Sequence, residues 1–250
     1  GYVPSTENTN AESARLGSVS STVSGLTARG ISSEVGTYGA TLYPWLRFRD
    51  TVTGGQFWGP PSIALIGAIS NSTARQELWF APAGFTRGGL TNGAAGIPVV
   101  GVREKLRKQD RDSLYAASIN PIAKFPDTGI VILGQKTLQS RKESATDRIN
   151  VRLLVNHLKR EISRIASTTI FEQNNEKTWF NFTSRVDPFL RSVKTRFGLK
   201  DYRLVLNSST TTPDLVDRNV IYAKIFIIPE SAVEFIAIDF IIGRTGASFA

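Results

Sequence analysis

The chain has 250 residues, 41% of them apolar, which is ordinary for a globular protein and enough for one large domain or two small ones. Its net charge of +9 predicts an acidic partner, such as nucleic acid, an anionic membrane surface or an acidic protein surface, although such a charge also serves solubility alone. The absence of cysteine excludes disulfides, thiolate metal sites and cysteine nucleophiles. No apolar run reaches the roughly 18 residues that a membrane-spanning helix needs.

The first 38 residues have the composition of a linker. They are rich in Ser, Thr, Gly and Asn and contain no Phe or Trp, so they offer little to a core. We interpret residues 1–38 as a tether or as the remnant of an upstream domain, because a chain that starts at Gly1 and has no Met is expected to be processed or partial. Residues 39–230 are interpreted as the core domain and residues 231–250 as a C-terminal arm.

The first half of the core is expected to alternate between strands, turns and helices. Residues 39–50 are strand-like with a break at Pro44, and a glycine turn then leads to Phe57 and Trp58. The Pro60-Pro61 pair suits the first turn of a helix over residues 62–71, because the missing N–H costs nothing there. Further along we expect a loop over 81–98, a charged helix over 103–115 and a short buried strand over 129–134.

Two strong amphipathic helices are predicted next. Residues 144–147 offer a capping box for the first, whose apolar stripe is Val151, Leu154, Leu158, Ile162 and Ile165. Asn174 or Asn175 can cap the second, whose stripe is Trp179, Phe182, Val186, Phe189, Val193 and Phe197. Gly198 should end it. Pro188 should kink or split the second helix, with Asp187 capping its second half.

The chain is expected to close in β-structure. Strands are predicted over residues 202–206 and 220–228, and a closing strand follows Pro229. Apolar residues occupy both faces of residues 232–242, so this strand needs cover on both sides. It is either the central strand of its own sheet or a strand lent to another chain. The order of elements predicts an α/β fold, a mixed β-sheet flanked by helices with extended terminal arms.

No catalytic, cofactor or metal site is predicted. The only histidine, His157, lies beside an apolar helical stripe and is more typical of a packed or surface residue than of a general base. The glycines between residues 88 and 96 lack the strand and helix context of a phosphate-binding loop. The acidic residues Asp110, Asp112, Asp147 and Glu161 each have a basic neighbour, which is typical of ion pairs. We therefore expect no enzymatic activity and no small-molecule substrate.

The first amphipathic helix is also basic. At 100° per residue, Arg148, Arg152 and Lys159 form one stripe beside the apolar face, while Arg160 and Arg164 lie away from the core. This pattern fits an ordinary solvated face or a docking surface for an acidic partner. Stacking aromatics are not interleaved with these cations, which disfavours nucleic acid. A basic nucleic-acid-binding module is the alternative interpretation of the whole chain.

Short stretches along residues 38–250 resemble the sheath proteins of contractile tails, as in contractile-tailed bacteriophages, pyocin-type particles and type VI secretion sheaths. The matching stretches are 43–45, 60–62 with Gly67, 81–84, 119–120, 129–138, 149–152, 171–174 ahead of Trp179, and 212–214. Each is weak alone, but their order is specific, and the resemblance is closest to phage sheaths. Because sheaths of this family are usually longer, the chain is expected to hold the conserved, tube-facing portion.

The resemblance implies a structural subunit of the virion tail, assembled in the host cytoplasm, that polymerises around an inner tube and contracts to drive the tube through the target cell envelope. The implied partners are other copies in a helical polymer or stacked hexameric rings, the inner tube protein, and baseplate and tail terminator proteins, with no direct contact to nucleic acid.

Two sets of residues acquire implied roles from this resemblance. Sheath subunits lend terminal strands to their neighbours, which here would use Val233, Phe235, Ile236, Ile238, Phe240 and Ile242. The basic helix would face an acidic tube through Arg148, Arg152, Lys159, Arg160 and Arg164. The short link at residues 229–231 also permits a local hairpin, so the closing strand can instead pair within its own subunit.

Overall fold

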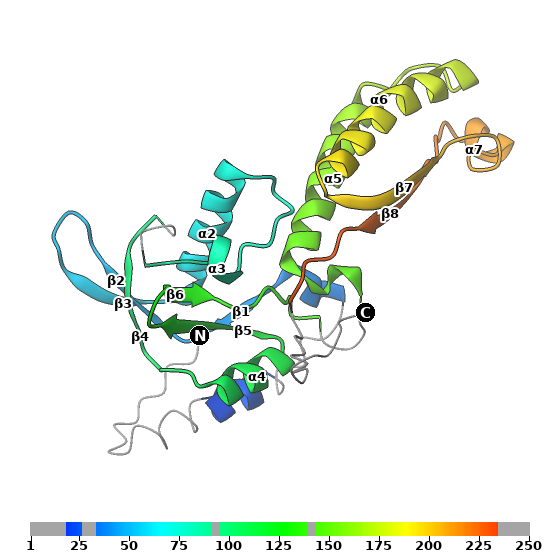
Figure 1. Cartoon of the computed structure of the whole chain (residues 1–250). Helices are drawn as coiled ribbons and strands as arrows, with labels where there is room; N and C mark the ends of the chain where they lie inside the picture. Colours follow the sequence, from blue (N-terminus) through cyan, green and yellow to red (C-terminus); the bar gives the residue numbers. More distant parts are fainter. Residues whose placement is uncertain (1–18, 27–33, 92–95, 140–143, 235–250) are drawn as a thin grey trace, which may run out of the picture.

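The computed structural model describes residues 19–26, 34–91, 96–139 and 144–234. It confirms a mixed α/β fold, but with three small sheets in place of one. Figure 1 shows a body that carries two of these sheets and a lobe that projects from it, built from the last helices and strands. The expected arms fall largely outside the described residues, which end at Glu234.

The body contains two three-stranded sheets. The first has the order β1 (Thr41–Tyr43), β5 (Ile119–Phe125), β6 (Gly129–Ile132), with β1 parallel to β5 and β6 antiparallel to it. The second has the order β3 (Gln56–Gly59), β2 (Leu46–Arg49), β4 (Val99–Val102) and is antiparallel throughout. The break at Pro44 is confirmed, because β1 and β2 on either side of it belong to different sheets.

Three helices cover these sheets in the body (Figure 1). They are α2 (Pro61–Arg75), α3 (Gly84–Arg87) and α4 (Lys108–Ala116). Helix α2 starts at the proline pair as predicted, whereas α3 lies in a segment that we expected to be loop. The first core cluster joins α2 to the strands through Leu46, Phe48, Ala64, Leu65, Ala68, Leu90, Val99, Ile122, Ile130, Ile132 and Ile149.

Two described pieces of the N-terminal segment contact the body. Residues 19–26 are helical, and η1 (Glu34–Tyr38) is a short 3-10 helix. Val19 is buried in a cluster with Tyr43, Leu114 and other apolar residues. These contacts are formed by a stretch whose composition is that of a linker.

The lobe is a helical pair packed on a two-stranded sheet. It consists of α5 (Ile149–Ser167), α6 (Glu176–Thr195), β7 (Leu199–Val205), α7 (Pro213–Asp217) and β8 (Lys224–Pro229), and β7 and β8 are antiparallel (Figure 1). A second core cluster holds it together, with Trp79, Leu154, Leu158, Phe182, Val186, Leu190, Val193 and Leu199 buried. Of the helices described, none is both long and apolar enough to cross a bilayer.

The predicted start of α5 needs a correction. Ser144 caps η2 (Ala145–Asp147), a short 3-10 helix, and α5 begins two residues later without a side-chain cap. The predicted apolar stripe of α5 is confirmed, with Leu154 and Leu158 buried and Ile162 and Ile165 packed against the same cluster.

Helix α6 confirms its predicted cap and corrects two other predictions. The Asn175 Oδ1 accepts a hydrogen bond from the Thr178 N–H at 3.0 Å. Pro188 lies inside α6 without splitting it, and Asp187 pairs with Arg191 instead of capping a second half. The sequence predicts that Phe197 belongs to the apolar stripe, but its side chain is exposed. Helix α6 ends at Thr195, and Phe197 has a left-handed backbone with φ of 60°.

Candidate assembly site

The two-stranded sheet of the lobe is open at its edges. Within the described residues β7 pairs only with β8, so each strand has one edge without a partner strand. The inner face packs Tyr202, Leu204, Ile225 and Ile227 against the helices. The outer face presents Phe226 and Ile228, which are 57% and 55% exposed. Open edges beside apolar side chains are the arrangement that accepts an added strand.

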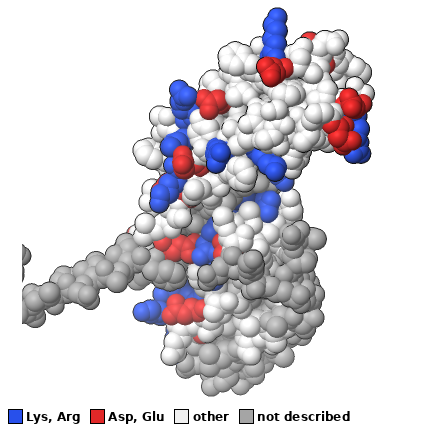
Figure 2. Space-filling model, turned by 90° about the vertical axis from the view of Figure 1, so that its right-hand side faces the viewer, with Lys and Arg blue, Asp and Glu red and all other residues white. Residues whose placement is uncertain are grey.

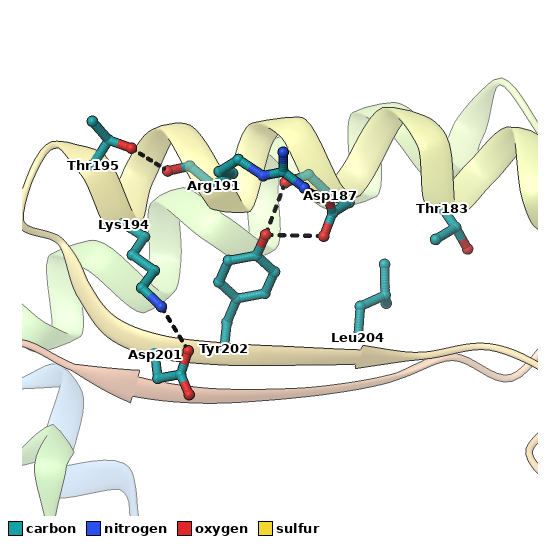
Figure 3. A pocket seen from close by; sticks show the side chains of 8 residues that line it. All are labelled: Thr183, Asp187, Arg191, Lys194, Thr195, Asp201, Tyr202 and Leu204. Carbon is teal, nitrogen blue, oxygen red and sulfur yellow. Dashed lines mark hydrogen bonds and ion pairs between the residues drawn. The ribbon is translucent and has the colours of Figure 1, made fainter.

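Polar contacts hold β7 against α6, as Figure 3 shows. The Tyr202 hydroxyl donates to Asp187 Oδ1 at 2.9 Å, and the Arg191 guanidinium pairs with the same carboxylate at 2.8 Å. Lys194 Nζ pairs with Asp201 Oδ1 at 2.8 Å. Burial and the bond to Asp187 raise the pKa of Tyr202 above its ordinary value. The surface pocket between these residues is therefore lined by charges that already have partners.

Two of the five residues of the predicted basic surface are engaged within the molecule. Arg148 precedes α5 and binds Glu234 and Asp147. Arg152 donates to the Thr37 hydroxyl and lies over the Tyr38 ring, 4.2 Å from its centroid. These two arginines therefore join α5 to other parts of the chain.

The other three basic residues are exposed farther along α5. Arg160 and Arg164 both lie near Glu161, at 3.5 and 3.1 Å, and Lys159 has no ion-pair partner among the described residues. On the face that Figure 2 presents, basic side chains of the lobe are scattered among acidic ones and form no continuous patch. Arg148 and Arg152 are thus separated in role from Lys159, Arg160 and Arg164.

The root of the C-terminal arm is held by one carboxylate. Glu234 accepts hydrogen bonds from Arg148 Nε at 2.6 Å, Arg148 Nη2 at 3.0 Å and the Tyr115 hydroxyl at 2.6 Å. Gln135 Nε2 donates at 3.4 Å. Val233 beside it is 80% exposed. The other predicted exchange residues, Phe235, Ile236, Ile238, Phe240 and Ile242, lie outside the described residues.

The electrostatics of this cluster favour the ionised carboxylate. Burial alone would raise the pKa of Glu234, but the hydrogen bonds from Arg148 and Tyr115 outweigh it and hold the pKa below its usual value. Burial and the bond to Glu234 raise the pKa of Tyr115. Sequence reasoning missed this pairing, because no local pattern links residues that are 119 positions apart.

The structure assigns ordinary packing roles to the residues weighed for chemistry. His157 lies between the rings of Trp79 and Phe189, at centroid distances of 6.0 and 5.9 Å, and burial lowers its pKa. The buried Asp110 accepts the Arg107 N–H at 2.7 Å at the start of α4. The residues that the structure describes contain no cluster of three or more His, Cys, Asp or Glu side chains suited to a metal ion.

The fold and the candidate site define a mixed α/β subunit with an open sheet on a projecting lobe. The chain is a homologue of phage tail sheath proteins. It is 35% identical over 193 residues to the tail sheath protein of Vibrio phage KVP40 and 33% identical over 192 residues to that of Enterobacteria phage T4. Each match covers 77% of this chain and 28% of the relative, so the chain spans little more than a quarter of the length of these proteins.

A solved structure agrees with this relationship at the level of fold. A chain of an extracellular contractile injection system, the PVC sheath complex in its contracted state, superposes with a TM-score of 0.71 at 24% identity. The match covers 82% of this chain and 56% of that chain, and at this identity it shows the fold alone. No model of a known protein family matches the chain.

Proposed function

We propose that the chain acts as a structural subunit of a contractile tail sheath, which polymerises around an inner tube and contracts to drive the tube through a target cell envelope. The observation that carries this proposal is the 35% identity over 193 residues to a phage tail sheath protein. Its partners would be other copies of itself, the inner tube protein, and baseplate and tail terminator proteins. Its place would be the tail of the virion.

Cohesion between subunits would come from strand exchange onto the β7–β8 sheet. The closing segment has apolar residues on both faces, so as an added strand it needs apolar neighbours on both sides. The β7–β8 sheet supplies them, with the helical cluster on its inner face and Phe226 and Ile228 on its outer face. Main-chain hydrogen bonds to an open edge would add to the stabilisation that this burial provides.

A single donated strand would hold two subunits only weakly. Burying the large apolar side chains from Val233 to Ile242 contributes about 10–21 kcal/mol, at about 1.5–3 kcal/mol each. Ordering the backbone of this segment costs on the order of 10–20 kcal/mol. Because these terms nearly cancel, firm cohesion requires many exchanges in one lattice, where later contacts form at high effective concentration.

Removal of residues 235–250 tests strand exchange. The full chain at high concentration should form rings, tubes or polysheath under negative-stain microscopy. The shortened chain should keep its circular dichroism spectrum and stay as discrete particles. A labelled peptide of residues 235–250, added at high concentration, should bind the shortened chain weakly but measurably. Normal polymers from the shortened chain would overturn the proposal.

The acceptor sheet can be tested with a matched pair of variants in the shortened chain. The double variant Phe226→Ser and Ile228→Ser removes apolar area from the outer face of β8 and should weaken peptide binding. The control is Val52→Ser with Ile66→Ser, two exposed apolar residues of the body. Equal peptide affinity in both double variants would exclude this face as the acceptor.

We also propose that the exposed part of the basic helix contacts the tube through Lys159, Arg160 and Arg164. Single exposed charge pairs are weak, typically below about 1 kcal/mol, so such a contact can hold the extended state and still release during contraction.

Reversing Lys159 and Arg164 to glutamate should loosen sheath from tube in a salt-dependent way. Reversing Lys177 and Lys200, which are exposed elsewhere on the lobe, changes the net charge equally and is the control. Equal retention on tubes by both variants would count against the contact.

A further inference from the structure

The arm leaves the described fold through a carboxylate that faces inward. The side chain of Glu234 is 17% exposed, although Val233 before it points into solvent. Arg148 Nε and Nη2 each donate a hydrogen bond to one carboxylate oxygen of Glu234. This bidentate geometry fixes the orientation of the carboxylate as well as its distance. Tyr115 adds a third short bond at 2.6 Å. The C-terminal arm, residues 231–250, is thus held at one defined residue near its start.

The receptacle for Glu234 is built by elements that are distant in sequence and joined to one another. Tyr115 comes from α4, Gln135 from the segment after β6, and Arg148 from the residue that starts α5. Main-chain bonds fasten the segment after β6 to the start of α5, from Ile149 N to Gln135 O at 2.7 Å and from Thr137 N to Asp147 O at 2.8 Å.

Side chains fasten the receptacle further. Lys136 Nζ donates to the Tyr115 main-chain oxygen at 2.8 Å and lies 4.2 Å from the centroid of its ring. Asp147 pairs with Arg148 at 3.0 Å and orients the guanidinium. These contacts do not involve Glu234, and they join the residues of the receptacle to one another independently of its carboxylate.

From this geometry we infer that Glu234 is a positioning residue, a clamp that fixes where and in which direction the C-terminal arm departs from the body. This inference rests on the proposed strand exchange. A donated strand whose first residue is anchored loses less conformational freedom when it docks, so the clamp favours exchange by preorganisation. It also connects the arm directly to α4 and to the start of α5, through the hydrogen bonds from Tyr115 and Arg148.

The clamp differs from an ordinary stabilising ion pair in what its loss would change. Loss of an ion pair that only supports the fold would lower thermal stability and leave the arm and the assembly of the folded chain unaffected. Loss of a clamp would change the spread of arm directions and raise the concentration needed for assembly. Glu230 provides a matched control, because it lies on the same segment, carries the same charge and has an exposed side chain.

The experiment compares Glu234→Ala with Glu230→Ala in the full chain. Because the protein has no cysteine, Ser113→Cys on α4 and Ala237→Cys in the arm can carry two spin labels without competing sites. In dilute, unassembled protein we expect a narrow distribution of label distances in the parent and in Glu230→Ala. Glu234→Ala should broaden it. The concentration for half-maximal assembly should rise about tenfold in Glu234→Ala only, reflecting lost preorganisation.

Each outcome distinguishes a clamp from an ion pair that only stabilises the fold. Equal distance distributions in the two variants, or a broadened distribution with unchanged assembly, would overturn the clamp. If Glu234→Ala does not fold, Arg148→Lys replaces it, because it keeps the charge but removes the two-bond grip. A second measurement distinguishes loss of the clamp from loss of strand exchange itself. Peptide binding to the shortened chain tests the acceptor alone, so binding without any effect of Glu234→Ala overturns only the clamp.

Discussion

Trp79 donates from its indole Nε1 to the main-chain oxygen of Arg196 at 2.9 Å, which ties the segment after α2 to the end of α6. The Arg196 guanidinium lies over the same ring, 5.5 Å from its centroid, and pairs with Glu77 at 2.7 Å. The body and the lobe are therefore joined at a point well separated in sequence from the start of α5. Chain packing at this junction leaves no room for a side chain at Gly198.

The first prediction concerns Gly198. A methyl group there would lie 2.6 Å from Val193 Cγ1 and 3.0 Å from Trp79 Cε2, both in the second core cluster. We expect Gly198→Ala to lower the free energy of unfolding by about 1–3 kcal/mol through overpacking. Chemical denaturation measures this. Gly89→Ala is the control, because its added methyl would meet no atom within 4 Å. Equal stability of the two variants would contradict the packing argument.

The second prediction concerns the contact between β7 and α6. Tyr202→Phe removes the hydroxyl that donates to Asp187 but keeps the ring against the lobe. We expect a loss of about 1 kcal/mol in the free energy of unfolding, the typical net value of one hydrogen bond. Tyr222→Phe, in the exposed segment just before β8, should change it by much less. Equal losses in a denaturation series would refute a specific role for the Tyr202 hydroxyl.

The third prediction concerns pH. The folded-state pKa of Glu234 is depressed below the ordinary value of 4.5, so the carboxylate stabilises the fold fully above that value. This stabilisation is lost as the pH falls through the folded pKa. The groups facing Glu234 are Arg148 and Tyr115, with Asp147 and Lys136 nearby.

The measurement is the difference in melting temperature between the parent and Glu234→Gln. It should be constant above about pH 5.5 and shrink toward zero as the pH is lowered below about 4.5. Glu230→Gln, with an exposed side chain on the same segment, should give a smaller difference at neutral pH. A difference that grows on acidification would have the wrong sign and would refute the assignment.

The fourth prediction concerns Pro188. It lies on an exposed position inside α6, where proline costs up to about 3 kcal/mol relative to alanine because it lacks an N–H and crowds the preceding turn. We expect Pro188→Ala to raise the free energy of unfolding by about 1–3 kcal/mol. The exposed Ser184→Ala on the preceding turn of α6 should have a small effect. A destabilised Pro188→Ala protein would show that the fold requires a distortion of α6 at this point.

Local signals predicted those elements whose residues satisfy one another within a short stretch. The α5 stripe from Leu154 to Ile165 and the Asn175 cap were predicted correctly because periodicity and capping depend on near neighbours. Strand β5 was missed because Pro121 lies within it. Its position depends on Asn120, whose amide donates to the main-chain oxygens of Thr41 and Lys136 and accepts the Lys136 N–H.

The amino-acid sequence by itself determined the mixed α/β character, the two amphipathic helices, the apolar closing segment and the resemblance to contractile sheaths. These properties follow from side-chain chemistry and spacing, which are the same in any conformation. Only the tertiary structure decided that the described residues form three small sheets, and that among them β7 and β8 pair with no further strand. It also decided that Glu234 faces Arg148 and Tyr115, because contacts over 86 and 119 residues arise only when separate elements pack, and no local pattern encodes them.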